Sequence, residues 1–296
     1  MRGRGAEVPP QQGACAGVHP VMRIHTLHCG CMRPFGGGLW DGLTPGMGPS
    51  RLTCRCLLAE SEDGLVLVDT GFGMGDVFDP EARLPGVARH ATRVRVAPED
   101  TAIVQVRTLG FDPKDVRHIV MTHLDYDHAG GLTDFPWATV HVSGREARDA
   151  RARRGLTGAM RYRPGQLRRD MREHDRLGQN WFGFAAFREG LPPGFVLVPL
   201  PGHTAGHCGV AVRTGAGWLL HAGDAVFNLR ELRAAPRCPP FALAYETMMQ
   251  RSGRIAAASQ AALRALLRGH SDEVQVICTH DPVADPFLPE MASRAA

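Results

Sequence analysis

The sequence predicts an α/β (α+β) fold in which two packed sheets carry helices on the outside. Short apolar runs typical of strands recur in each half of the chain, and a segment with helical spacing follows each set. No long linker separates the halves. A content of 44% hydrophobic and 22% charged residues excludes a disordered or fibrous protein. We therefore expect a disordered leader over residues 1–20, rich in Gly, Pro and Gln, and a single domain over residues 21–296.

The first half is expected to contain strands that end in polar turns. Residues 51–60 alternate in part between apolar and polar side chains, and residues 64–68 form an apolar run that ends at the turn Asp69-Thr70-Gly71. The other elements expected in this half are a short helix at 113–117 and strands at 118–121 and 139–142.

The second half repeats this pattern. Its expected strands are residues 195–198, 208–212, 217–220 and 274–278. A helix is expected over residues 245–267, where apolar residues recur at helical spacing.

Arginine is concentrated between residues 145 and 176, where eleven arginines accompany five acidic residues in a chain of net charge +4. This segment is expected to be a helix broken at Gly155 and Pro164. It is either a solvated helical face, the interpretation that we favour, or a surface that receives an anionic group.

The remaining composition concerns the location of the chain. No apolar run approaches the roughly 20 residues that a membrane-spanning helix needs. Arg2 and Arg4 are not followed by an apolar stretch, so a cytoplasmic location is expected.

The eight cysteines include two C-x-C pairs, at 29–31 and 54–56, which we interpret as reduced thiols in strands, with a metal or redox pair as the alternative.

Four polar clusters each follow a strand-like run. The densest is HLDYDH at residues 123–128, which places four potential metal ligands within six residues. The others are PGHTAGH at 201–207, HAGD at 221–224 and THDP at 279–282. Because strand ends in a layered sheet fold converge at one edge, these His and Asp side chains predict a metal site there.

This order of motifs resembles the metallo-β-lactamase superfamily. The resemblance extends over about residues 22–285 and comprises D-T-G after an early strand, H-x-[HED]-x-D-H, G-H-T-x-G-H, G-D, and a late strand that ends in His. It implies a four-layer αβ/βα sandwich of two mixed sheets, with a metal site at one edge and a metal-dependent hydrolase activity.

The resemblance also implies roles for individual residues. The first metal ion would be held by His123, Asp125 and His203. The second would be held by Asp127, His128 and His280, with Asp224 as the bridge. Residues expected to orient these ligands are Asp69, Thr122 and His207, and for Asp69 a role as a turn former alone is an equal alternative. His221 is expected to be structural.

Asp125 departs from the commonest family pattern, which has His at this position. With two divalent ions, three ligand carboxylates and a bridging hydroxide, the charges sum to zero, where a His would leave +1. We expect two divalent ions, with zinc as the default and iron or manganese as alternatives, because oxygen ligands suit harder ions.

Such a site predicts hydrolysis by metal-bound hydroxide. Asp127 is the carboxylate expected to pass a proton to the leaving group, and Tyr126 and Tyr245 are expected to be surface or packing residues. Within the family, the run HLDYDHAGGL at 123–132 resembles quorum-quenching N-acyl homoserine lactonases and small-ester hydrolases. Those lactonases place a Tyr where this chain has Phe227.

The expected substrate is a small molecule with an ester, lactone or thioester bond, and no membrane partner is expected. Candidate pocket residues are Trp181, Phe182, Phe184 and Phe227, with a core-packing loop as the alternative for the first three. Two other functions remain as alternatives. One is a nuclease that binds the phosphates of a nucleic acid with the arginine-rich segment. This function is disfavoured because the positive charge is confined to that segment. The other is a non-catalytic sensor.

Overall fold

The computed structural model describes residues 22–282, and the expected leader lies outside this part of the chain. The first sheet has seven strands in the order β4-β1-β2-β3-β5-β6-β7. Their bounds are β1 (Arg23–Met32), β2 (Leu52–Ser61), β3 (Gly64–Val68), β4 (Val94–Arg95), β5 (Val116–Val120), β6 (Thr139–Ser143) and β7 (Arg172–His174). The strands β3, β5, β6 and β7 pair in parallel, so their carboxyl ends lie at one edge of the sheet.

The second sheet has four strands in the order β10-β11-β12-β13. Their bounds are β10 (Phe195–Pro199), β11 (Cys208–Thr214), β12 (Gly217–His221) and β13 (Val274–Ile277). The pairs are antiparallel except β12 and β13, which are parallel. A separate hairpin joins β8 (Gln179–Trp181) to β9 (Phe184–Ala186).

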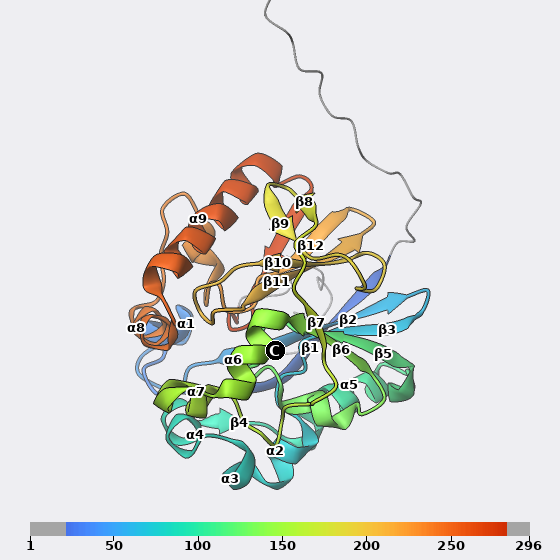
Figure 1. Cartoon of the computed structure of the whole chain (residues 1–296). Helices are drawn as coiled ribbons and strands as arrows, with labels where there is room; N and C mark the ends of the chain where they lie inside the picture. Colours follow the sequence, from blue (N-terminus) through green and yellow to red (C-terminus); the bar gives the residue numbers. More distant parts are fainter. Residues whose placement is uncertain (1–21, 283–296) are drawn as a thin grey trace, which may run out of the picture.

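The helices lie outside the two sheets (Figure 1). The α-helices are α1 (Gly38–Asp41), α2 (Met74–Phe78), α3 (Pro80–Arg83), α4 (Gly86–Thr92), α5 (Ala102–Thr108), α6 (Gly144–Ala152), α7 (Gly155–Arg161), α8 (Pro240–Met249) and α9 (Gly253–His270). The short 3₁₀ turns are η1 (Pro98–Asp100), η2 (Pro113–Asp115), η3 (Gly130–Asp134) and η4 (Leu229–Leu232).

The buried side chains form layers that match this arrangement. Between the sheets, Val66 and Val120 of the first sheet share one cluster with Leu197 and Val210 of the second. On its other face the first sheet packs against residues of α5 and α6. The second sheet packs on its other face against α9 and the β8–β9 hairpin. The predicted sandwich of two sheets with helices outside is therefore confirmed.

Every expected strand coincides with a strand of the structure, but β1, β4, β7, β8 and β9 were not predicted, and the predicted helix over 245–267 was wrong in extent. It is two helices, α8 and α9, separated at residues 250–252. In this break the amide of Arg251 donates to the carbonyl of His203 (3.0 Å), and the amide of Ser252 donates to that of Gly202 (3.1 Å). These amides support the loop that carries His203, which explains the interruption.

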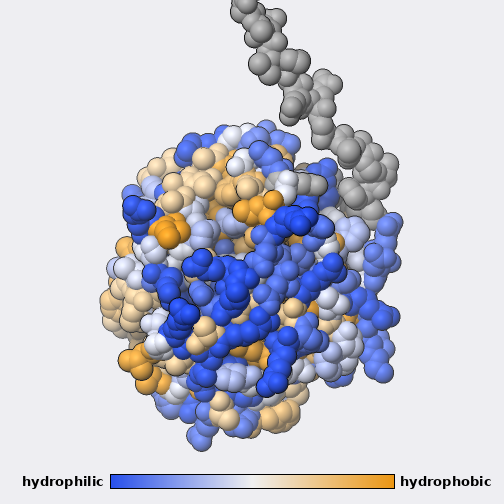
Figure 2. Space-filling model, in the orientation of Figure 1, coloured by the Kyte–Doolittle hydropathy of each residue, from blue (hydrophilic) through white to orange (hydrophobic). Residues whose placement is uncertain are grey.

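The arginine-rich segment also differs from a simple broken helix. It forms α6 and α7, and after Pro164 the chain runs on to β7 at the end of the first sheet. On α6, Arg148 pairs with Asp175, which directly follows β7, and Arg151 pairs with Glu173, which lies on β7. Figure 2 shows hydrophilic residues gathered over α6, as expected of a solvated face.

Two further expectations concern the cysteines and the membrane. Cys29 and Cys31 lie on β1, Cys54 and Cys56 lie on β2, and all four are free thiols. Within residues 22–282, no helix combines the length and apolar character that crossing a bilayer requires.

Candidate metal centre

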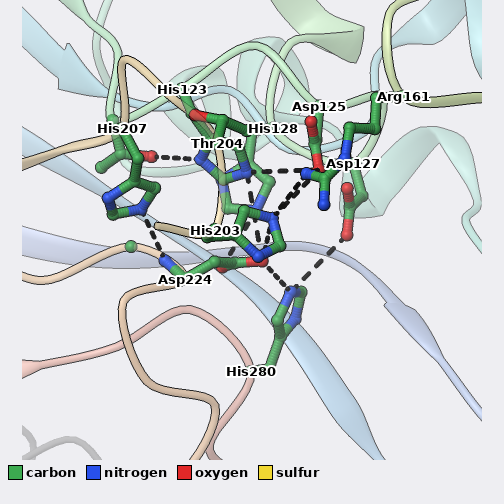
Figure 3. A network of polar contacts seen from close by, with 12 residues as sticks. His123, Asp125, Asp127, His128, Arg161, His203, Thr204, His207, Asp224 and His280 are labelled. Atoms are coloured by element: carbon green, nitrogen blue, oxygen red, sulfur yellow. Dashed lines mark hydrogen bonds and ion pairs between the residues drawn. The ribbon is translucent and has the colours of Figure 1, made fainter. Parts of the chain in front are cut away.

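Seven His and Asp side chains meet where strands of both sheets end (Figure 3). The segment after β5 supplies His123, Asp125, Asp127 and His128, and the loops after β10, β12 and β13 supply His203, Asp224 and His280. Each of the seven residues is at most 6% exposed. The structure therefore brings together all the residues expected to be metal ligands.

The first ligand group, defined as His123, Asp125 and His203, is compact. The Nε2 atom of His203 lies 3.1 Å from Oδ2 of Asp125, and Nε2 of His123 lies 3.7 Å from the same oxygen. Ligand atoms around one tetrahedral zinc ion are about 3.3 Å apart, given bonds of about 2.0 Å. The spacing in this group is close to that value.

The second ligand group, defined as Asp127, His128, Asp224 and His280, has similar spacing. Asp224 presents Oδ1 to Nε2 of His128 (3.2 Å) and Oδ2 to Nε2 of His280 (3.1 Å). The Nε2 atom of His280 is also 3.6 Å from Oδ2 of Asp127. Because Oδ2 of Asp224 is 3.6 Å from Nε2 of His203, this carboxylate lies between the two groups.

Asp69 fixes the orientation of two histidines of the centre. It follows β3 in a left-handed conformation (φ 56°) and accepts from the amide and the hydroxyl of Thr122, both at 2.7 Å. It also accepts from Nδ1 of His128 (2.9 Å). Since the Thr122 hydroxyl donates to Asp69, its oxygen accepts from Nδ1 of His123 (3.0 Å). Asp69 is therefore more than a turn former.

His207 and Thr53 orient the other loops. Nδ1 of His207 donates to the carbonyl of Leu200 (3.0 Å), so its Nε2 accepts from the amide of Asp224 (3.0 Å). Nδ1 of His280 donates to the carbonyl of Thr53 (2.7 Å). His221 donates to the carbonyl of Arg55 and accepts from the amide of Gly223, a structural role as expected.

These hydrogen bonds decide whether the site fits a metal ion. When His123, His128 and His280 are in their neutral, metal-binding form, these bonds place the proton on Nδ1, so that Nε2 presents a lone pair to the centre. Among the described residues, Nε2 of His123, Nε2 of His128 and Oδ1 of Asp224 are buried without a hydrogen-bond partner, and they form a group able to hold an ion. Ligand histidines that donate their other nitrogen to a protein acceptor are typical of metal centres, so these residues fit a divalent metal.

Burial and neighbouring charges act differently on the carboxylates. Burial raises the pKa of Asp127, and His128 and His280 offset only part of that rise. Burial also opposes ionisation of Asp224, but His280 and His128 hold its pKa well below the ordinary value. Asp224 is thus an anion in the centre, while Asp127 is the carboxylate more able to hold a proton.

Arg161 is a site residue that the sequence analysis missed. This last residue of α7 is 3% exposed, and its Nη1 donates to Oδ2 of Asp125 (2.5 Å) and to Nε2 of His203 (3.0 Å). Burial alone would raise the pKa of Asp125, but Arg161 and the adjacent histidines hold it well below the ordinary value. The available signal was the Asp at position 125, whose extra buried charge calls for a cation.

Glu146 was also missed, although it joins the main loops of the site. This fully buried residue of α6 accepts from the amide of Leu124 (3.1 Å), the hydroxyl of Thr204 (2.6 Å) and the hydroxyl of Tyr162 (3.2 Å). Acidic residues are scattered among the arginines of this segment, and nothing in that pattern indicated that Glu146 faces inward. Glu146 positions both the Asp125 and the His203 loops.

Cys54 is the third residue that the sequence analysis did not place at the site. Its sulfur and ligand atoms of Asp127 and His280 all lie within 4.8 Å of one another. The position of β2 beside the last loop brings the thiol there.

The predicted substrate-pocket residues divide into two sets. Trp181 is in the core, packed edge-on against Trp218, and Phe182 packs against His270 at the end of α9. Phe184 belongs to the same hairpin. Because Trp218 is the second residue of β12 and His270 is the last of α9, the hairpin packs at the opposite end of these elements from the site. These three residues are corrected to core packing.

Phe227 does lie at the site. Its ring centroid is 4.9 Å from that of His280 and 6.0 Å from that of His203. The ring of Tyr245, from α8, lies 6.1 Å from Phe227, and burial raises the pKa of its phenol. Tyr245 is therefore a residue beside the centre as well as a packing residue.

The model of the Metallo-beta-lactamase superfamily matches residues 50–280 of this chain. The chain belongs to this superfamily. A probable metallo-hydrolase of Mycobacterium tuberculosis (strain ATCC 25618 / H37Rv) is 40% identical over 267 residues, which are 89% of this chain and 81% of that protein. An N-acyl homoserine lactonase of Azorhizobium caulinodans is 31% identical over 175 residues, covering 56% of this chain and 62% of the lactonase.

Solved structures share the fold. An N-acyl homoserine lactone hydrolase with N-hexanoyl-L-homoserine at its catalytic metal centre aligns with a TM-score of 0.64 and 22% identity, covering 88% of this chain and 94% of that one. A dizinc quorum-quenching lactonase aligns with a TM-score of 0.58 and 15% identity, covering 88% of each chain. At these identities the likeness shows the fold alone.

Proposed function

We propose that this chain is a metal-dependent hydrolase that opens an ester or lactone bond of a small molecule. The observation that carries the proposal is the set of buried, unpartnered ligand atoms around Asp224, formed by histidines whose other nitrogen is already bonded within the protein. Zinc is the proposed metal because imidazole nitrogens and carboxylate oxygens suit it, and iron and manganese are the alternatives.

The chemistry divides between the metal and the chain. A divalent ion held by the histidines and carboxylates of this centre would supply a nucleophilic hydroxide near neutral pH and would polarise the carbonyl. Asp127 accepts the proton released by the attacking water and passes it to the leaving oxygen, a role supported by the position of its carboxylate in the centre, 3.6 Å from Nε2 of His280. Asp69 and His207 hold His128 and Asp224 in position, so that these residues need not reorganise during turnover.

The ester or lactone class is supported by the similarity to named lactonases and by the aromatic wall of the site. Phe227 stands where the resembling lactonases place a Tyr. Tyr245 brings a phenol beside it from a different element, at 6.1 Å between rings. We propose that Tyr245 supplies the hydrogen-bond donor to the substrate that Phe227 lacks.

A nuclease is less well supported by the arginines. Arg148 forms two hydrogen bonds with Asp175, at 2.9 and 2.8 Å, and Arg151 pairs with Glu173. Phosphate tracking uses positive charges that attract phosphate anions, and these two are neutralised by acids.

The test is a hydrolysis panel on protein stripped of metal and then loaded with zinc, manganese or iron. The panel contains acyl homoserine lactones, aryl esters, thioesters and β-lactams. We expect turnover of lactones or esters that a chelator removes and added metal restores. Absence of turnover with every metal and every ester or lactone would overturn the proposal.

A further inference from the structure

The cation Arg161 occupies the first ligand group and not the second. Its Nη1 atom donates to Oδ2 of Asp125 at 2.5 Å and to Nε2 of His203 at 3.0 Å. These are two of the three atoms that would bind a metal ion in this group. Figure 3 shows the guanidinium between the Asp125 and His203 side chains.

A metal ion and this guanidinium exclude each other. An ion in the first group would lie about 2.0 Å from Oδ2 of Asp125 and from Nε2 of His203. The Nη1 atom of the guanidinium already lies within hydrogen-bond distance of the same oxygen and the same nitrogen, and two cations at that separation repel strongly in a buried site.

The charges agree with this interpretation. Asp125 contributes −1 and Arg161 contributes +1, so the carboxylate of the first group is already neutralised by another side chain of the protein. In the second group, the ion-pair partners of Asp127 and Asp224 within the described chain are all histidines. Among the residues that the structure describes, only the first group has a permanent cation of its own.

We propose that Arg161 is a built-in cation that takes the place of the first metal ion, so that the protein binds one divalent ion, in the second group. A second ion binds only by expelling the guanidinium from Asp125 and His203. This inference rests on the metal centre of the proposed function and narrows the expected two ions to one.

The test is a count of bound zinc after chelation, reloading and removal of free metal. The variants are Arg161→Leu and the double variant Asp125→His with Arg161→Leu, which restores a neutral first group. Arg169→Leu is the matched control, because it removes one positive charge from an exposed position of the same arginine-rich segment. Circular dichroism checks that each protein is folded.

We expect one equivalent of zinc in the wild type and in Arg169→Leu, and two in the double variant. Arg161→Leu is expected to hold two if it folds without metal, and the double variant decides the matter if it does not. Two equivalents in the wild type, or one in the folded double variant, would overturn the proposal. The count uses no substrate, so it is separate from a failure of the hydrolysis panel.

Discussion

The two ligand groups share Asp224 as a neighbour, but they balance their buried charge in different ways. In the first group Asp125 is paired with Arg161 at 2.5 Å, and in the second group Asp127 has a histidine at 3.6 Å and a pKa raised by burial. The carboxylate of the first group has a permanent cation beside it, whereas that of the second has none among the described residues, and buried atoms without a hydrogen-bond partner remain in both groups. The two groups of the centre therefore differ in how their carboxylates are balanced.

The largest expected effect comes from removing the residue between the groups. Asp224→Ala deletes the carboxylate that faces His128, His280 and His203, so we expect loss of bound metal and a fall in kcat/KM of about a thousand-fold or more. Metal content and kcat/KM on the best substrate measure it. Asp272→Ala, outside the centre, is the control, and wild-type turnover in folded Asp224→Ala would show that the bridging position is unimportant.

The difference between the two groups is tested most directly by neutralising one carboxylate in each. Asp125→Asn leaves Arg161 buried without its anion, so we expect the metal-free protein to lose about 3 kcal/mol of unfolding free energy. Asp127→Asn removes a carboxylate whose ionisation burial opposes, and it should leave the unfolding free energy unchanged or raise it. Urea unfolding of both variants measures the difference. Equal losses in the two variants would contradict the asymmetry.

Asp69→Asn tests the hydrogen bonds that orient both groups. It acts on His128 directly and on His123 through Thr122, so we expect metal affinity to fall by about 10–100-fold. A competition titration against a chromophoric chelator measures this. Asp79→Asn, at the exposed start of α3, is the control, and unchanged affinity in Asp69→Asn would reduce Asp69 to a turn former.

The last prediction concerns the pH dependence of stability at a third acidic cluster, Glu231 and Glu246. Burial and Glu231 raise the pKa of Glu246 to about 9. An unfolded Glu has a pKa of about 4.3, so between these values the folded state holds a proton that the unfolded state releases. Stability should therefore fall as pH rises from about 4.3 to 9.

Glu246→Gln removes that proton requirement. We expect its melting temperature to exceed that of the wild type at pH 8, and to approach it at pH 4.5. Glu62→Gln, in an exposed turn, should show no such pH dependence relative to the wild type. A gain that is the same at both pH values would contradict the raised pKa.

The strands and the ligand residues were predictable from sequence for the same physical reason. Apolar runs such as Gly64–Val68 mark buried strands, and the polar residues that follow them lie at the sheet edge by construction. The ligands are thus placed by local sequence once the strands are found.

Arg161, Glu146 and Cys54 were not predictable in this way. Arg161 faces inward because α7 ends beside the Asp125 loop, and ten other arginines in the same segment obscure it. Trp181 shows the opposite error, because it was expected to line a substrate pocket and instead lies in the core. It packs there because the β8–β9 hairpin folds onto the second sheet. In each case the contact joins segments that are far apart in the sequence, and no local sequence pattern predicts such a contact.

The most direct measurement is anomalous diffraction at the zinc edge from crystals of zinc-loaded protein. The predicted result is one strong peak among Asp127, His128, Asp224 and His280, with the Arg161 guanidinium still on Asp125 and His203. A second peak of equal height between Asp125 and His203, or no peak in the second group, would contradict the account.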